Sequence, residues 1–123
     1  MIRSIFPALA LLAVSPALAQ ASAPRADVPL DVSQRTALRC SVAFALVAEG
    51  QARGDPAMAA FPQLGERGRE FFVRTAARIM DQTGLDREAV AGLLAAELED
   101  LRAGGALEDV MPPCLLLLDA SGL

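Results

Sequence analysis

The chain has 123 residues and a formal net charge of −4, and its eleven basic residues are all arginine. It contains no histidine, lysine, tryptophan or tyrosine, so the usual bases of nucleophilic catalysis and most of the rings that stack on single-stranded bases are missing. An acidic chain also neutralises phosphates poorly, which excludes nucleic acid as an expected partner.

The first nineteen residues predict a signal peptide. Arg3 supplies a positive start, residues 5–14 are almost entirely apolar, and Ala17-Leu18-Ala19 is the small-x-small pattern that a signal peptidase recognises. We expect cleavage after Ala19, with Ala23 as the second choice. The apolar stretch is shorter than the roughly 20 residues of a membrane-spanning helix, so the expected product has no membrane anchor and lies in the periplasm of a bacterial cell or outside it.

Removal of residues 1–19 leaves 104 residues, and the loss of Arg3 changes the net charge from −4 to −5. Residues 20–30 mix alanine, serine, proline and single charges without a period, which predicts a flexible arm. Residues 31–123 are then expected to form one domain. A domain of this size buries a small core and benefits from a cross-link.

Cys40 and Cys114 are the only two cysteines, and in an oxidising compartment they predict one structural disulfide. The chain has no C-x-x-C motif, which argues against thioredoxin-like redox chemistry and covalent haem. Two thiols without histidine are also a poor zinc site. We therefore expect no cofactor and no metal.

The first helix is expected from Asp31 or Ser33 to about Glu49. Asp31 and Gln34 have the spacing of a capping box, and Gly50 is expected to take the left-handed conformation that ends the helix. Apolar residues occur on all sides of this segment, which is typical of a central helix surrounded by others.

A short turn is expected at Asp55-Pro56, followed by a second helix over 63–83 that Gly84 closes. The period of 3.6 residues predicts a packing face made of Phe72, Ala76, Ile79, Met80 and Thr83, together with the helix-destabilising glycines Gly65 and Gly68. The two glycines suggest that a neighbouring backbone approaches closely there. The expected outer face consists of Arg67, Glu70, Arg74 and Arg78.

The third helix is expected to begin after the N-cap Asp86, with Leu85 and Val90 placed for a hydrophobic staple, and to stop at Gly104-Gly105. In the tail, periodicity does not distinguish a strand from a helix for the leucines 115–118. Because no partner strand is expected, we predict a helical turn over 106–111, a bend at Pro112-Pro113 and a short helix over 113–119. The predicted fold is all-α: three long helices and a short C-terminal helix around the central first helix, closed by one disulfide.

Glu97 falls within the apolar stripe of the third helix, and a carboxylate there needs a partner or has a raised pKa. The candidates are Arg39, Arg69 and Arg78, and we predict a buried ion pair between Glu97 and Arg39. A lone acid is a weak indication of catalysis. The charges of the segment 65–74 predict a salt-bridged outer face, with an arginine cluster for a phosphate or carboxylate ligand as the alternative.

These features predict a small exported binding or chaperone-like module with an unknown protein partner, and no enzyme. In outline, a small helical protein with one disulfide is similar to the acid-stress chaperones of enteric periplasms, although no sequence motif carries this likeness. The alternative is a helical-bundle carrier of an apolar ligand, which requires an apolar cavity of roughly several hundred Å3.

Overall fold

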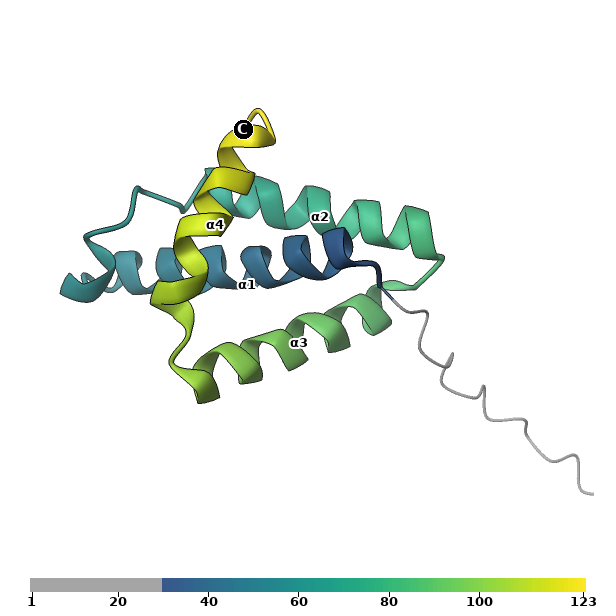
Figure 1. The fold of residues 1–123 in the computed structure, drawn as a ribbon, viewed down its shortest axis with the longest axis horizontal. Helices are drawn as coiled ribbons and strands as arrows, with labels where there is room; N and C mark the ends of the chain where they lie inside the picture. Colours follow the sequence, from purple (N-terminus) through teal and green to yellow (C-terminus); the bar gives the residue numbers. More distant parts are fainter. Residues whose placement is uncertain (1–29) are drawn as a thin grey trace, which may run out of the picture.

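The computed structural model describes residues 30–123, so the predicted signal peptide, its cleavage site and nearly all of the arm over 20–30 lie outside the described residues. The described part is all-α, as predicted (Figure 1). Its elements are α1 (Val32–Ala52), the short 3-10 helix η1 (Pro56–Met58), α2 (Arg67–Thr83), α3 (Arg87–Gly104) and α4 (Leu107–Ala120). The bond between Cys40 and Cys114 closes the bundle.

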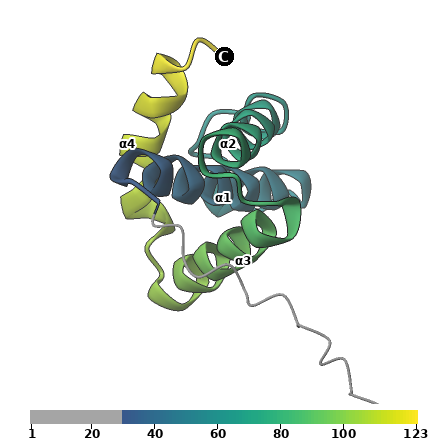
Figure 2. The same cartoon turned by 90° about the vertical axis from the view of Figure 1, so that its right-hand side faces the viewer.

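Helix α1 lies at the centre of the bundle and contacts α2, α3 and α4 (Figures 1 and 2). The five consecutive residues from Cys40 to Phe44 are all buried, and they cover more than one full turn of the helix. Neighbours must therefore surround α1 on every side, and the prediction of a central first helix is confirmed. Figure 1 shows α4 crossing α1, and the C-terminal end of α4 reaches α2, where Asp119 pairs with Arg67.

The capping box at the start of α1 is confirmed, since Gln34 N donates to Asp31 Oδ1 at 2.8 Å and Asp31 N donates to Gln34 Oε1 at 2.9 Å. The predicted C-terminal end is wrong, because α1 continues to Ala52 and Gly50 is a buried helical residue. A Cβ at Gly50 would lie 2.5 Å from Cγ of Met58. This glycine therefore allows η1 to approach the helix closely, and does not serve as a left-handed cap.

The connection between η1 and α2 is held by one side chain, the amide of Gln51. Its Nε2 donates to the carbonyl oxygens of Met58, Phe61 and Pro62 at 3.2, 3.2 and 2.9 Å, and its Oε1 accepts from the backbone N–H of Leu64 at 3.1 Å. These bonds satisfy backbone groups of a connection that is not helical, and α2 begins only after it, at Arg67. The expected start at residue 63 is wrong.

The side of α2 that packs against α1 also differs from the prediction. The buried residues of α2 are Gly68, Phe71, Thr75 and Ile79, so Gly68 and Ile79 of the predicted face are confirmed, whereas the predicted Phe72, Ala76 and Met80 are half-buried. Gly68 makes the close approach that its position suggested, since a Cβ there would lie 3.0 Å from Cβ of Phe44. Gly65 precedes the helix and a Cβ there would meet nothing within 4 Å, so its expected packing role is wrong.

The link from α2 to α3 follows the predicted signals. Gly84 is left-handed with φ 72°, and Asp86 caps α3 by accepting from Ala89 N at 2.8 Å. Leu85 and Val90 lie in one buried cluster with Leu30, Leu38 and Ile79. This cluster forms the end of the core where α1 begins, and the larger cluster around Phe44 and the disulfide forms the rest.

Helix α4 is continuous through Pro112 and Pro113, so the predicted bend and the division of the tail into two helical pieces are wrong. Both prolines are exposed, whereas Met111, Cys114 and Leu118 are buried. The backbone donors that the prolines remove would lie on the solvent side of the helix, where water satisfies the freed carbonyl oxygens. Burial of the opposite side keeps the helix in one piece.

Candidate functional site

The disulfide joins the middle of α1 to the middle of α4. The Cα atoms of Cys40 and Cys114 lie 5.2 Å apart, and the two residues are 2% and 1% exposed. Residues packed around them belong to the main core cluster. The sulfurs are thus part of the core, and their position fits a structural cross-link rather than a site of thiol exchange.

The structure brings Glu97 to Arg39 and adds a second carboxylate. Arg39 Nη1 donates to Glu97 Oε2 at 3.0 Å and to Asp100 Oδ2 at 2.8 Å, which ties α1 to α3. The hydrogen bond to Asp100 raises the pKa of Arg39, and the charge of Glu97 raises it further against the effect of partial burial. The side chains of Arg39 and Glu97 are 33% and 22% exposed. The pair is therefore half-buried, and the arginine compensates the glutamate.

Residues 30–123 contain no cluster of three or more His, Cys, Asp or Glu side chains that could hold a metal ion. In the same range, no helix combines the length and the hydropathy that a membrane span requires.

An apolar groove of about 500 Å3 runs between α2 and α3 on the surface of the bundle. We call it the α2–α3 groove, and its apolar side chains include Phe72, Val73, Ala76, Met80, Val90 and Leu94. Of the three large apolar side chains that are exposed in residues 30–123, only Val73, which is 56% exposed, lines this groove. The half-buried face of α2 that was predicted to pack inward thus forms one wall of a groove that is open to solvent.

A smaller hollow of about 240 Å3 continues from this groove and shares Phe72 and Leu94 with it. Ala45 and Leu46 of α1 also line it, so the central helix contributes to this part of the surface. Arg87 lines the α2–α3 groove, and Arg102 lines the smaller hollow together with Glu49. The combined surface is apolar along its length and carries charges toward its ends.

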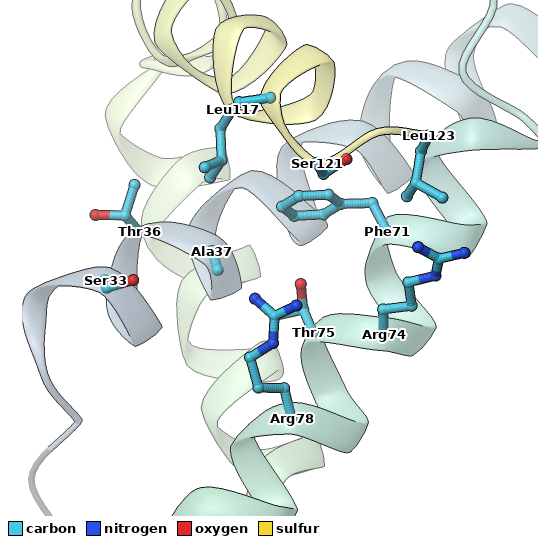
Figure 3. A pocket seen from close by; sticks show the side chains of 11 residues that line it. Ser33, Thr36, Ala37, Phe71, Arg74, Thr75, Arg78, Leu117, Ser121 and Leu123 are labelled. Carbon is cyan, nitrogen blue, oxygen red and sulfur yellow. The ribbon is translucent and has the colours of Figure 1, made fainter.

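A second, separate hollow of about 480 Å3 lies between the first turns of α1, the middle of α2 and the end of α4 (Figure 3). We call it the α1–α2–α4 pocket. Its apolar side chains include Phe71, Leu117 and Leu123. Its polar side chains are Ser33, Thr36, Thr75, Ser121, Arg74 and Arg78. It shares no lining residue with the α2–α3 groove, because the two hollows use different sides of α2.

The arginines of α2 do not form the uniform outer face that the sequence predicted. Arg74 pairs with Glu70 at 2.9 Å, as the spacing indicated. Arg67 is half-buried, and it donates to Asp119 Oδ1 and to the carbonyl oxygen of Leu123, both at 3.0 Å. Arg67 therefore ties α2 to the end of α4, and its assignment to the outer face is wrong. Arg69 and Arg78 form no ion pair with Glu97, whose partner is Arg39.

Neither hollow was recognised in the sequence. The α2–α3 groove exists because the side of α2 with Phe71 faces α1 and the side with Phe72 does not. Both sides of α2 are apolar, so the sequence did not decide between them. The α1–α2–α4 pocket joins residues that lie up to ninety positions apart, from Ser33 to Leu123. The only signal in the sequence was the alternative interpretation of the α2 arginines as an anion site, and that interpretation named Arg74 but not Thr75.

Comparison with protein-family models, with curated proteins and with solved structures found no match to this chain.

Proposed function

We propose that this protein is an exported binding module, chaperone-like in its use of an exposed apolar surface, and that its α2–α3 groove takes an apolar segment of a partner protein. The leader pattern of residues 1–19 supports export. The Cys40–Cys114 bond supports it as well, because such bonds form and persist mainly in oxidising compartments. A role without catalysis is proposed because the chain has neither histidine nor lysine.

The exposure of Val73 within the groove is the observation on which this proposal rests. Val73 sits among Phe72, Ala76 and Leu94, so the apolar surface is contiguous rather than a single exposed side chain. Contiguous apolar patches on small soluble proteins usually mark interaction sites. Met80 in the same wall favours a binding surface that adapts to more than one apolar side chain.

An amphipathic helix is the segment that best fits such a groove, with apolar anchors spaced three and four residues apart. The groove runs between two helices, and Arg87 gives it a charged end. Its small area predicts weak and reversible binding, with a dissociation constant in the micromolar range, about 1–100 µM.

The test uses the oxidised protein and a labelled 18-residue amphipathic peptide with leucines at helical spacing, followed by fluorescence anisotropy. Val73→Asp places a charge in the groove at an exposed position, so it should reduce peptide affinity at least about tenfold while the fold is retained. Val32→Asp is the matched control, because Val32 is 75% exposed and does not line the groove. Equal binding by both variants would overturn the proposed surface.

The chaperone-like role is tested separately by light scattering of an acid-unfolded client protein. Suppression of aggregation at an equimolar ratio, and its loss in Val73→Asp, supports this role. An absence of suppression removes it and leaves the peptide-binding module.

A carrier of an apolar small molecule is the second candidate, because the side chains around Phe72 and Leu94 are almost all apolar. The hollows are open at the surface, which favours a partner's segment over a lipid enclosed between helices. The test of the carrier function is an uncharged solvatochromic dye. Binding of this dye to the oxidised protein, its loss in Val73→Asp and an absence of peptide binding would together favour a carrier of small apolar molecules.

A further inference from the structure

The hydroxyl of Thr75 is the unusual feature of the α1–α2–α4 pocket. Thr75 is 7% exposed, and its hydroxyl has no hydrogen-bond partner among residues 30–123. The other two threonines in this range bond to the carbonyl oxygen four residues earlier, Thr36 to Val32 at 2.8 Å and Thr83 to Ile79 at 2.6 Å. That bond is the ordinary solution for a threonine within a helix. Thr75 therefore keeps a free hydroxyl in a buried position.

This hydroxyl opens into the pocket. In the described part of the chain, every fully buried side-chain nitrogen or oxygen has a hydrogen-bond partner, so the unpartnered oxygen of Thr75 must reach open space. Figure 3 shows it pointing from α2 toward the ring of Phe71, inside the hollow that both residues line. Water in the pocket can therefore bond to this hydroxyl in the free protein, and the polar head of a ligand can take the place of that water.

A positive charge lies beside this hydroxyl. Arg74 and Arg78 are four residues apart on α2 and both line the pocket, and two like charges at this spacing destabilise a helix slightly. Glu70 compensates Arg74 at 2.9 Å, whereas Arg78 has no ion-pair partner among residues 30–123. Thr75 is three residues from Arg78, so the two side chains share one side of the helix.

The acidic side chains near Arg78 form no ion pair with it, and this includes Asp81, three residues later on α2. Asp31 lines an adjoining hollow with Arg78, but its carboxylate accepts from Gln34 N at 2.8 Å in the capping box. Asp119 at the end of α4 is bound to Arg67 at 3.0 Å. Arg78 therefore lines the pocket without an ion-pair partner among residues 30–123.

We infer that the α1–α2–α4 pocket binds a small amphipathic carboxylate, with its head group held by Arg78 and the Thr75 hydroxyl and its apolar body against Phe71 and Leu117. The arginine fork matches a carboxylate with two parallel hydrogen bonds. A single unpaired arginine fits a monoanion better than a phosphate monoester, which carries about −1.5 to −2 charges at pH 7. The apolar wall adds a requirement for a hydrocarbon chain.

This site is separate from the α2–α3 groove, so it does not depend on the proposed function. The probe is decanoate, titrated calorimetrically into the oxidised protein at neutral pH. Acetate has the same head group without the chain, decanol has the chain without the charge, and inorganic phosphate has neither a chain nor a single charge. Decanoate should bind saturably and at least about tenfold more tightly than each of the three.

Four variants locate the site. Arg78→Gln should weaken decanoate binding at least about tenfold, and Thr75→Val about threefold to tenfold, because each removes a hydrogen bond to a charged group. Thr75→Ser keeps the hydroxyl and should retain the affinity. Arg69→Gln is the matched control, since Arg69 is an exposed arginine of the same helix that does not line the pocket. Circular dichroism of each variant establishes that the fold is retained.

The inference is overturned if decanoate does not bind saturably, or if decanol or phosphate binds as tightly. It is also overturned if Arg78→Gln and Thr75→Val bind like Arg69→Gln. Decanoate binding that survives Arg78→Gln but is lost in Val73→Asp would place the ligand in the α2–α3 groove, which equally contradicts this site. Binding that depends on Arg78 while the peptide fails to bind would support this pocket and overturn only the proposed peptide-binding function.

Discussion

Cys40 and Cys114 lie 5.2 Å apart at their Cα atoms, although 74 positions of sequence separate them. The bond therefore closes a loop that contains most of α1, all of α2 and α3, and half of α4. It also joins the central helix α1 to α4, the helix that contains Pro112 and Pro113.

Breaking this bond should lower stability strongly. A loop of this length is expected to contribute about 4 kcal/mol by restricting the unfolded chain, which is close to the total stability of many small domains. Urea unfolding followed by circular dichroism should show a large decrease in midpoint for Cys40→Ala combined with Cys114→Ala. The same decrease is expected when the unmodified protein is reduced. Equal midpoints for oxidised and reduced protein would contradict the role given to the bond.

Arg39 connects α1 to α3 through Glu97 and Asp100, so Arg39→Gln should destabilise the protein by about 1 kcal/mol, the upper end for a partly exposed pair. The control is Arg53→Gln, which breaks an exposed pair with Glu49 at the C-terminal end of α1 and should change stability by less than about 0.5 kcal/mol. If thermal unfolding shows the same small effect for both, the connection between α1 and α3 does not contribute as stated.

The pH dependence of the Arg39 contribution follows from the raised pKa of this residue. A raised folded-state pKa means that the contribution is fully present below the ordinary pKa of arginine and is lost only as the pH rises through the raised value. Arg39 should therefore stay charged between about pH 6 and 9, and its contribution to stability should not change with pH in this range. The difference between Arg39→Gln and the unmodified protein, measured across this range, should be constant.

Two glycines in helices should respond oppositely to alanine. Gly68→Ala should destabilise the protein by about 1 kcal/mol, because the new methyl group would lie 3.0 Å from Cβ of the fully buried Phe44 and neither helix can move freely. Gly92→Ala should stabilise it by up to about 1 kcal/mol, since a Cβ there meets nothing within 4 Å and alanine favours the helix. Urea midpoints measure both. Stabilisation by Gly68→Ala would show that the contact between α1 and α2 is looser than described.

Pro113→Ala should stabilise α4 by about 1–3 kcal/mol, because it restores a backbone donor within the helix at an exposed position. Pro56→Ala is the matched control. Pro56 occupies the start of η1, where proline is favourable, so this change should bring no gain. Hydrogen exchange of the α4 amides should slow in Pro113→Ala alone. Unchanged exchange would indicate that packing already holds this turn of α4 fully.

The sequence predicted helix ends correctly where the capping residue and the group that it bonds lie within one helical turn. Asp31 with Gln34, Gly84, and Asp86 with Ala89 each end or begin a helix as predicted, because capping depends on residues three or four positions apart. The cysteine pairing was also predictable, because the chain offers only one intramolecular combination.

The wrong predictions for the start of α2 and for the continuity of α4 involve contacts between residues that are not neighbours in the sequence. The start of α2 depends on Gln51, which bonds to Leu64 thirteen positions later. The continuity of α4 through Pro112 depends on the burial of Met111 and Cys114 against α1. Periodicity alone could not decide between Phe71 and Phe72, since neighbouring residues of one apolar face are only 100° apart.

The central position of α1 also sets the order in which this molecule can assemble. A ribosome makes α1 before the three helices that cover it, so its apolar surface is present early and has nothing to pack against. Cys40 likewise emerges as a single thiol and waits for Cys114 until α4 has been synthesised. The apolar surface of α1 is therefore covered completely only after α4, the last helix to be synthesised, has been added.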